Sequence, residues 1–171
     1  MAHLTIMTPV GPFTVVGQGK TVLGSGFTDG IEPLIPLIHP DLRDTLVDGD
    51  DSRDLEPAAD AVRAYFAGDL AALDTVDVRQ RSGGSFLETA WDALREVPPG
   101  DVVTYTELAA RSGRPSAVRA AASACARNAA ALFVPCHRIV RTDGSLGGYR
   151  YGLEIKRWLR SHEQLAAKTR S

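Results

Sequence analysis

The chain has 171 residues, of which 44% are hydrophobic and 23% are charged. This composition excludes a globally disordered chain, and the length suits one domain or two small lobes. No apolar run approaches the roughly 18 residues that a membrane span needs, and the N-terminus lacks the pattern of a signal peptide. We therefore expect a soluble, cytoplasmic protein without a membrane partner.

The net charge of −2 hides an uneven distribution. Residues 1–100 contain 7 Lys and Arg against 16 Asp and Glu, whereas residues 101–171 contain 12 against 5. The basic C-terminal part is suited to contact with a polyanion, although solvated surface charge is the alternative explanation.

Three short runs rich in β-forming residues open the chain, at residues 3–8, 12–17 and 21–27. Glycine and proline between them indicate turns, so the sequence predicts a small antiparallel sheet. Residues 29–54 contain three prolines and a dense acidic stretch, which predicts a loop with short pieces of structure. The apolar spacing over 56–67 predicts a helix that completes an N-terminal lobe.

Three short helices are predicted after residue 81. Ser85 and Glu88 fit a capping box at the start of the first helix, and Thr104 and Glu107 fit another at the start of the second. The third is expected over residues 115–127, because proline suits a first turn. The second and third match a helix-turn-helix, a pattern that also occurs in hairpins that bind nothing.

Alanine dominates the third helix, whose long polar side chains are Arg119 and Arg127. A helix this thin packs closely inside a protein core. It also enters a groove of DNA, where arginines neutralise phosphates or insert into the base stack. Composition alone leaves both interpretations open.

The run LFVPCHRIV, residues 132–140, sets Cys136, His137 and Arg138 inside an apolar segment. We expect extended chain up to Pro135, and in extended chain neighbouring side chains point to opposite sides. Cys136 and His137 would then interact only through a bend or a bridging water. A buried thiol is inert unless a base or a positive field supports its thiolate. Structural burial is the alternative, but the basic residues after the thiol favour catalysis.

The stretch PCHRIV resembles the active-site signature of the O6-alkylguanine-DNA alkyltransferases, in which PCHR precedes Val or Ile and then Val. The similarity continues without a gap over residues 90–159, and DGSLGGYRYG is closest to the form in the C-terminal half of the adaptive-response regulator Ada. The N-terminal lobe is similar in outline, chiefly at TPVGPFTVVGQG.

This resemblance implies an α/β (α+β) fold. Residues 1–80 would form a small ribonuclease-H-like lobe with an antiparallel sheet and a helix. Residues 81–171 would form a mainly helical, DNA-binding alkyltransferase domain that contains the helix-turn-helix and the active-site cysteine.

The same resemblance assigns catalytic roles. Cys136 accepts the alkyl group, His137 acts through a water as the base that removes the thiol proton, and Glu163 orients and charge-balances that histidine. Asn128 ties the recognition helix to the active-site segment, and the hydroxyl of Tyr105 donates a proton to the leaving base.

Binding roles follow in the same way, with Arg119 as the side chain that fills the stack after a nucleotide is flipped. The expected DNA contacts, in the minor groove, are Arg119, Ala120, Ser123, Arg127 and Thr104, and the expected substrate pocket comprises Tyr149, Val134, Pro135 and Arg150.

The implied function is DNA repair. The protein would flip O6-methylguanine, with O4-methylthymine as a further candidate, out of duplex DNA and transfer the alkyl group to Cys136. Because a thioether resists hydrolysis, each molecule would act once and need no cofactor. A methylated-DNA–protein-cysteine S-methyltransferase in the bacterial cytosol is expected, as a monomer whose cooperative assembly on DNA is left open.

Two other functions fit parts of the pattern. A lesion binder of the alkyltransferase-like kind would carry tryptophan in place of Cys136, and a cysteine hydrolase would turn over esters or amides without DNA. The chain also departs from the family at Ala129, where proline often follows the asparagine, and at Arg150, where some members have serine. Since the N-terminal lobe has no cysteine, we predict no metal site.

Overall fold

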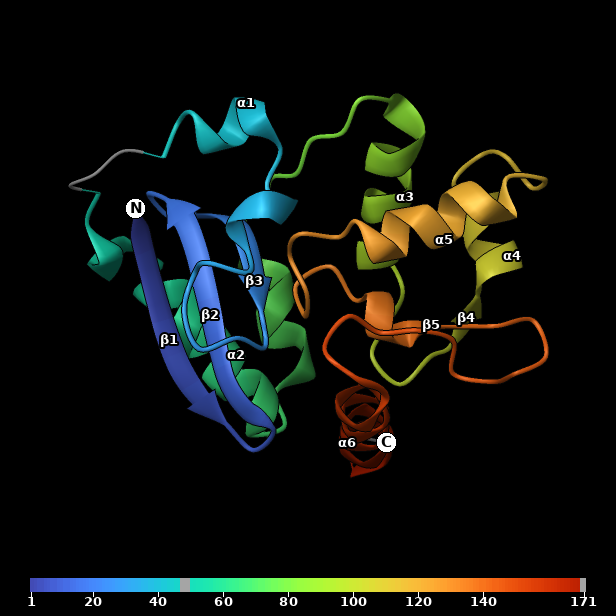
Figure 1. Ribbon diagram of the computed structural model, residues 1–171. Helices are drawn as coiled ribbons and strands as arrows, with labels where there is room; N and C mark the ends of the chain where they lie inside the picture. The colour runs from blue at the N-terminus through green and yellow to red at the C-terminus, as the bar shows by residue number, and fades with distance from the viewer. Residues whose placement is uncertain (47–49, 170–171) are drawn as a thin grey trace. The chain divides into compact units, whose positions relative to one another are not determined.

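The computed structural model describes residues 1–46 and 50–169 and divides into two units (Figure 1). The first unit comprises Met1–Arg81 and Ala129–Phe133, and the second comprises Ser82–Asn128 and Val134–Ser171. Residues 129–133, predicted to lie in the C-terminal domain, belong instead to the first unit, because their backbone pairs with its sheet. The likeness of that unit to ribonuclease H stays a prediction.

The predicted antiparallel sheet is confirmed. Its strands are β1 (Ala2–Thr8), β2 (Gly11–Gln18) and β3 (Thr21–Gly26), in the order β1-β2-β3. The two hairpin turns use Gly11 and Gly19, whose φ angles are 112° and 56°, a region that glycine enters without the steric cost of a Cβ.

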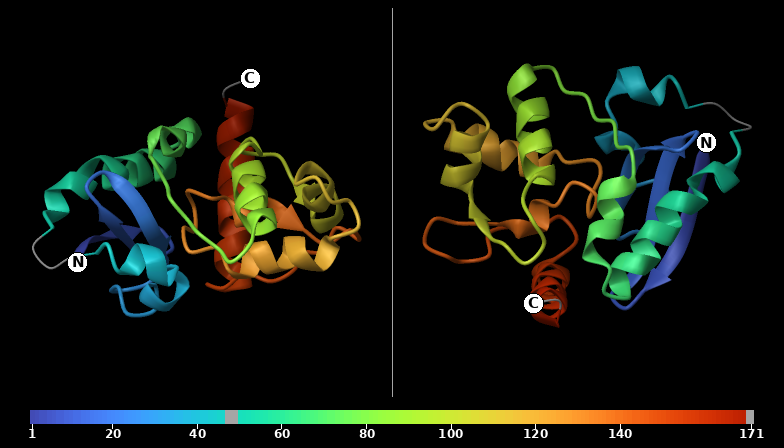
Figure 2. Two further views of the ribbon diagram at one scale, coloured as in Figure 1. Left: turned by 90° about the horizontal axis from the view of Figure 1, so that it is seen from above. Right: turned by 180° about the vertical axis from the view of Figure 1, so that it is seen from behind.

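Both faces of β2 are covered, as five consecutive buried residues, 13–17, indicate. Helix α2 (Glu56–Phe66) packs against the sheet (Figures 1 and 2). Segment 31–46 contributes the short helices η1 (Ile35–Leu37) and α1 (Pro40–Arg43). Its apolar side chains form a cluster with two strand residues, namely Val16, Leu23, Leu34, Ile38, Leu42 and Leu46. The loop predicted over 29–54 is therefore part of the core where it is described.

Two segments pair with the outer edge of β3. The first segment follows the short helix η2 (Ser52–Leu55), helix α2 and the short helix η3 (Leu70–Thr75) in the chain. In it, the carbonyl of Asp77 accepts from the amide of Val22 at 2.9 Å. Further along, the amide of Ser25 donates to the Ala129 carbonyl at 2.8 Å and its hydroxyl donates to the Ala131 carbonyl at 2.8 Å. The chain directly ahead of the cysteine segment is thereby held at the sheet.

The second unit contains helices α3 (Ser85–Arg95), α4 (Tyr105–Arg111), α5 (Val118–Ala126) and α6 (Leu153–Thr169). Helices α3, α4 and α5 pack on one another, and the indole of Trp91 donates to the carbonyl of Ala124 at 2.9 Å. Strands β4 (Val103–Thr104) and β5 (Ile139–Val140) pair in parallel. Helices α4 and α5 form the predicted helical hairpin (Figure 1).

Local signals placed one helix start correctly and misplaced two. The Thr104 hydroxyl accepts from the Glu107 amide at 3.1 Å, which confirms that capping box. At α3, however, the N-cap is Gly84, and Glu88 accepts from the amide of Ser82 at 3.1 Å instead of from the predicted cap. Helix α5 begins three residues after the predicted proline, because residues 114–117 form a turn closed by a backbone hydrogen bond.

The prediction of extended chain before the cysteine is wrong. Leu132 has a φ of 75°, and Cys136–Arg138 form one 3-10 turn, η4. The segment is apolar because it is buried as a turn. Hydrophobicity alone does not distinguish a buried turn from a buried strand.

No helix among residues 1–46 and 50–169 is long and apolar enough to cross a membrane.

We expect Leu34→Ala to lower the free energy of unfolding by about 2–5 kcal/mol, because Leu34 is fully buried in the cluster on β2 and β3. Leu37→Ala is the matched control, since Leu37 lies three residues away and is only half-buried. Urea denaturation measures both. Equal losses for the two variants would show that segment 31–46 is not part of the folded core.

Candidate active site

The thiol of Cys136 lies at the start of η4, in a tight turn of the backbone. The amide of Cys136 donates to the Val134 carbonyl at 2.9 Å, and the amide of Arg138 donates to the Pro135 carbonyl at 3.0 Å. Pro135 itself has no N–H to satisfy, which suits a residue that enters a turn. The backbone is therefore bent at Cys136 and His137, where extended chain was predicted.

Asn128 joins the end of α5 to this turn. Its side-chain Nδ2 donates to the Val134 carbonyl at 2.8 Å and to the sulfur of Cys136 at 3.4 Å. A donor directed at sulfur favours the thiolate over the thiol. Asn128 thus positions the turn and lowers the free energy of the Cys136 thiolate.

His137, Arg138 and Glu163 form a buried ionic cluster, with exposures of 0%, 5% and 1%. The Nε2 atom of His137 lies 2.6 Å from Glu163 Oε2. Arg138 donates through Nε to Oε1 of Glu163 at 2.8 Å and through Nη2 to Oε2 at 3.0 Å, while its Nη1 donates to the Val97 carbonyl at 2.7 Å. A two-point contact of this kind fixes both carboxylate oxygens.

This cluster selects one tautomer of the histidine. A carboxylate only accepts hydrogen bonds, so the Nε2 atom of neutral His137 carries the proton and donates to Glu163. The other ring nitrogen, Nδ1, then has a free lone pair, and it accepts no hydrogen bond from any residue that the structure describes. Nδ1 is the atom that can take up a proton.

Burial lowers the pKa of His137 below its ordinary value, and contact with Glu163 offsets only part of this effect. Burial alone would raise the pKa of Glu163, but its contacts with His137 and Arg138 outweigh burial and hold the pKa below its ordinary value. At neutral pH the cluster therefore consists of a neutral imidazole, a carboxylate and a guanidinium.

Lys156, which was not predicted as a site residue, lies close enough to Cys136 for its charge to act on the thiol. Lys156 is fully buried, and its Nζ donates to the carbonyls of Leu146 at 2.5 Å and Gly148 at 3.1 Å. Burial lowers the pKa of Lys156, and the nearby thiols oppose that shift. Its spacing of seven residues from Glu163 on one helix placed both side chains on the same face, a signal that was available in the sequence.

The side chain of Cys136 is a protonated thiol at neutral pH. Burial raises the pKa of Cys136, while the hydrogen bond from Asn128 and the charge of Lys156 oppose that rise. Cys136 is 9% exposed. The other thiol, Cys125 on α5, is half-buried, and burial raises its pKa strongly. A thiol in this state needs an adjacent base to react.

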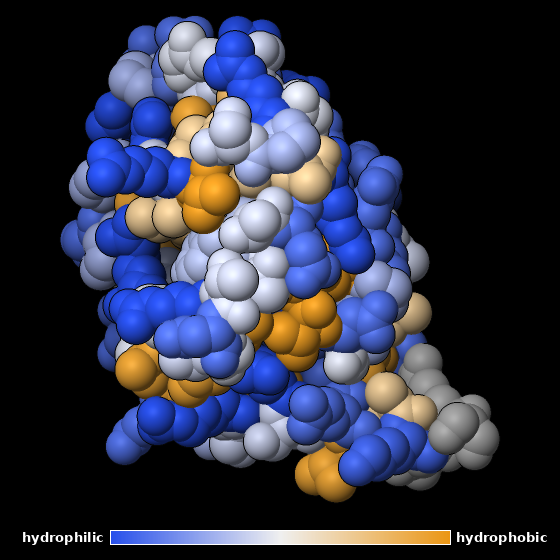
Figure 3. Space-filling view, turned by 90° about the vertical axis from the view of Figure 1, so that its right-hand side faces the viewer, coloured by the Kyte–Doolittle hydropathy of each residue, from blue (hydrophilic) through white to orange (hydrophobic). Residues whose placement is uncertain are grey.

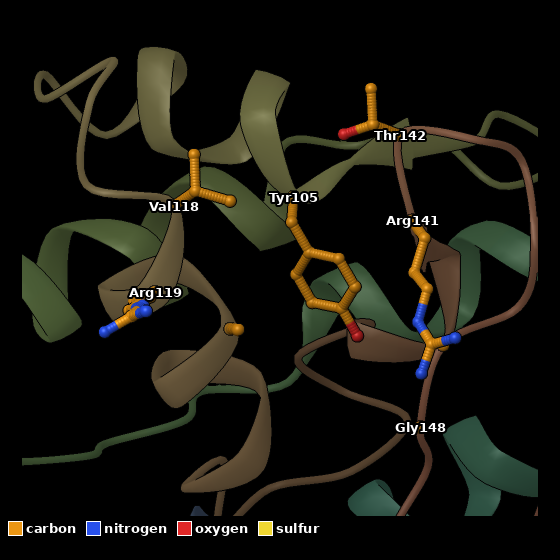
Figure 4. A pocket seen from close by; sticks show the side chains of 8 residues that line it. Tyr105, Val118, Arg119, Arg141, Thr142 and Gly148 are labelled. Atoms are coloured by element: carbon orange, nitrogen blue, oxygen red, sulfur yellow. The ribbon is translucent and has the colours of Figure 1, made fainter.

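A cavity of about 410 Å³ opens beside α5 (Figure 4). It is lined by Tyr105, Val118, Arg119, Ala122, Arg141, Thr142, Gly147 and Gly148. The hydroxyl end of Tyr105 packs on the 147–148 backbone, since a Cβ added to Gly147 would lie 3.0 Å from that oxygen. Burial raises the pKa of Tyr105 to about 12. The volume is within the range of pockets that hold small ligands.

The residues proposed to bind DNA lie around the hairpin. Arg119 is exposed in the first turn of α5, and Arg127 is exposed at its C-cap. Ala120 and Ser123 are half-buried. The Thr104 hydroxyl is occupied as the cap of α4, where it also contacts the Glu107 carboxylate at 3.1 Å. The side of the molecule that Figure 3 shows is mostly hydrophilic with scattered hydrophobic side chains.

The four residues proposed for the substrate pocket do not line this cavity. Val134 and Pro135 are buried in the turn before the thiol. Tyr149 is half-buried, its hydroxyl has no hydrogen-bond partner within the described chain, and its ring centroid is 5.7 Å from that of Tyr151. Arg150 is exposed and donates to the Ala126 carbonyl at the end of α5.

No group of three or more His, Cys, Asp or Glu side chains within residues 1–46 and 50–169 could hold a metal ion.

Comparison with known proteins decides the family. Residues 85–165 match the family model of the 6-O-methylguanine DNA methyltransferase DNA-binding domain. The chain is 35% identical over 162 residues to the methylated-DNA–protein-cysteine methyltransferase of Salmonella typhimurium, covering 92% of each chain. The chain belongs to the O6-methylguanine DNA methyltransferase family.

Two further relatives match different lengths of the chain. The bifunctional transcriptional activator and DNA repair enzyme Ada of Escherichia coli is 49% identical over 88 residues, which are 52% of this chain and 24% of Ada. The crystal structure of Mycobacterium tuberculosis OGT in complex with DNA superposes with a TM-score of 0.77 at 30% identity, covering 96% of this chain and 93% of OGT. The methyltransferase fold therefore extends over both units.

The pKa shifts predict that stability falls in acid. The folded protein holds the pKa of His137 below 6.5 and that of Glu163 below 4.5, so the unfolded chain binds more protons at low pH. Their stabilising contribution is complete above pH 6.5 and is lost as the pH falls towards the two folded-state values.

We expect the free energy of unfolding to decrease from pH 7 to pH 4, and His137→Gln to flatten the part of that slope between pH 6.5 and 5. Urea denaturation across this range measures the slope. His39→Gln, at a half-buried histidine in the first unit, is the control and should leave the slope unchanged. The same slope in the His137 variant as in the parent protein would contradict the assignment.

Lys156→Met should slow the alkylation of Cys136 by iodoacetamide at pH 7, because it removes a positive charge that lowers the pKa of the thiol. Each unit by which that pKa rises reduces the thiolate fraction about tenfold. Peptide mass analysis separates Cys136 from Cys125. Arg157→Met, at the exposed neighbouring residue, is the control. If Cys136 in Lys156→Met reacts with iodoacetamide at the same rate as in the parent protein, this lysine supports only the backbone.

Proposed function

We propose that this protein repairs O6-methylguanine in DNA by transferring the methyl group to its own Cys136. Family membership supports the reaction, and one observation carries the choice of residues. The thiol directly precedes His137, whose Nε2 is held by a buried carboxylate at 2.6 Å, which leaves Nδ1 as the base.

The first step is formation of the thiolate. Nδ1 of His137 removes the proton of Cys136 through a bridging water, and the imidazolium that forms is stabilised by Glu163. Asn128 then stabilises the negative sulfur by its hydrogen bond, and Lys156 stabilises it by its positive charge. Because burial raises the pKa of the thiol, it remains protonated until this base acts.

Methyl transfer is a direct displacement. Sulfur forms a bond to the methyl carbon while the bond from that carbon to O6 breaks, and the electron pair passes to the guanine ring. The Tyr105 hydroxyl donates a proton to the leaving base, so that neutral guanine is restored, and Tyr105 recovers a proton from the imidazolium through solvent. The thioether is stable to water, so each protein molecule acts once and no cofactor is required.

Chemistry on a base inside a duplex requires that the base be turned out of the stack. The exposed face of α5 combines the small side chains Ala122 and Ala126 with Arg119 at one end and Arg127 at the other. This thin face suits the minor groove, about 6 Å wide, and Arg119 would replace the extruded base. O4-methylthymine is a further proposed substrate, because it presents the same methyl group on an exocyclic oxygen.

The two alternative functions are less well supported. A lesion binder without a nucleophile does not explain a thiol beside a histidine and carboxylate pair. A cysteine hydrolase would release product and turn over, which does not agree with the relatives that match over most of the chain. The protein is proposed to act as a monomer, and cooperative assembly on DNA would appear as a binding curve steeper than that of a single site.

The test is incubation with a duplex that bears a labelled O6-methyl group, followed by peptide mapping. One label per protein molecule is expected, on Cys136. Cys136→Ala should abolish transfer and retain binding to the duplex, whereas Cys125→Ala, a matched change at the other thiol, should retain transfer. Label on another residue, or repair of many lesions by one molecule, would refute the proposal.

A further inference from the structure

One side chain that lines the cavity beside α5, that of Arg141, is not among the residues to which the sequence motifs assign a role. Arg141 and Arg119 both line it, and Figure 4 shows them on either side of Tyr105. Neither guanidinium forms a hydrogen bond or an ion pair with any residue in the described part of the chain. Two unpaired guanidinium groups at one cavity attract an anion.

The small parallel sheet explains why Arg141 lies there. Val103 pairs with Ile139 and Thr104 pairs with Val140. Tyr105 and Arg141 are the residues that directly follow this pair, where α4 begins, and both line the cavity. The next pair is joined directly, because the hydroxyls of Thr106 and Thr142 lie 3.0 Å apart. The backbone of Arg141 is thus held near Tyr105 by the strand pairing before it and by the hydroxyl contact after it.

The backbone that carries Arg141 is also fixed. Its amide donates to the Ser145 carbonyl at 2.9 Å, and its carbonyl accepts from the Gly144 amide at 2.9 Å. The carboxylate of Asp143, two residues further along the chain, accepts from the amide of Ser145 at 2.9 Å and from its hydroxyl at 2.7 Å. Asp143 is exposed and faces this serine, so Arg141 remains available to an outside anion.

We propose that Arg141 binds a phosphodiester of the DNA strand next to the extruded nucleotide. This inference rests on the proposed function, since it takes Tyr105 to face that nucleotide. Acidic side chains are absent from the cavity lining, which offers guanidinium groups and hydroxyls of Tyr105 and Thr142 as donors. Guanidinium and hydroxyl donors together are the groups that bind phosphate in protein–DNA contacts.

A phosphate contact has a thermodynamic signature. Each phosphate that a side chain neutralises contributes about 0.9 to the slope of log K against log salt concentration. Arg141→Gln should therefore reduce this slope by about 0.9 and weaken binding about tenfold at 0.1 M salt. Arg141→Lys should keep the slope, because charge determines it. Arg157→Gln, at an exposed arginine on α6, is the matched control with an unchanged slope.

Binding is measured by fluorescence anisotropy with a lesion-containing duplex, in the non-reactive Cys136→Ala background. Next, single phosphates around the lesion are replaced one at a time by neutral methylphosphonates. One replacement should weaken binding of the Arg141 form and leave binding of Arg141→Gln unaffected. If every replacement weakens both forms by the same factor, or if the salt slope of Arg141→Gln equals that of the parent, the phosphate contact is wrong.

Single-turnover repair distinguishes this inference from the proposed function. In protein with an intact thiol, Arg141→Gln should methylate Cys136 at the parent rate constant once DNA binding is saturated. A lower rate constant at saturation would place Arg141 in the chemical step and overturn a role limited to binding. Failure of the parent protein to methylate Cys136 would refute the function itself, whatever the outcome at Arg141.

Discussion

The active site depends on one buried carboxylate. Glu163 is 1% exposed, and removing such a group from water costs several kcal/mol unless its oxygens are paired. Arg138 supplies the compensating charge in a two-point contact, and His137 supplies a further donor. The amide of Gly100 also approaches Oε1, at 3.4 Å. The turn that carries Cys136 is thereby joined to the final helix.

The contacts with Glu163 also give the adjacent residues His137 and Arg138 different roles. Arg138 neutralises the carboxylate, so His137 need not be protonated to satisfy it. Burial then keeps the imidazole neutral, and a neutral imidazole is the form that accepts a proton. Arg138 therefore supports the neutral form of His137 through Glu163.

The alanine-rich helix α5 shows that the two interpretations of its composition are compatible. Ala121 and Ala124 are fully buried on one face, where the Ala124 carbonyl receives the hydrogen bond of Trp91. Ala122 is exposed and lines the cavity on the other face. Small side chains permit close approach on both sides, so one helix packs in a core and remains thin towards solvent.

Local patterns in the sequence determined most of the elements. Alternating β-formers separated by glycine turns specified the three strands, and the Thr104 cap specified the start of α4, because these signals act within a few residues. The PCHR motif indicated the family, since it brings together a thiol, an imidazole and a guanidinium that rarely adjoin by chance in an apolar run.

The tertiary structure alone decided how those residues are arranged. The apolar run around Cys136 is a turn and not a strand, because its burial comes from contacts distant in the sequence. Lys156 is buried because the carbonyls of residues 146 and 148 accept from it, and Arg141 lies beside Tyr105 because two strands pair 36 residues apart. Sequence periodicity indicates which face of an element is buried, but the partner that covers it is chosen only when the chain folds.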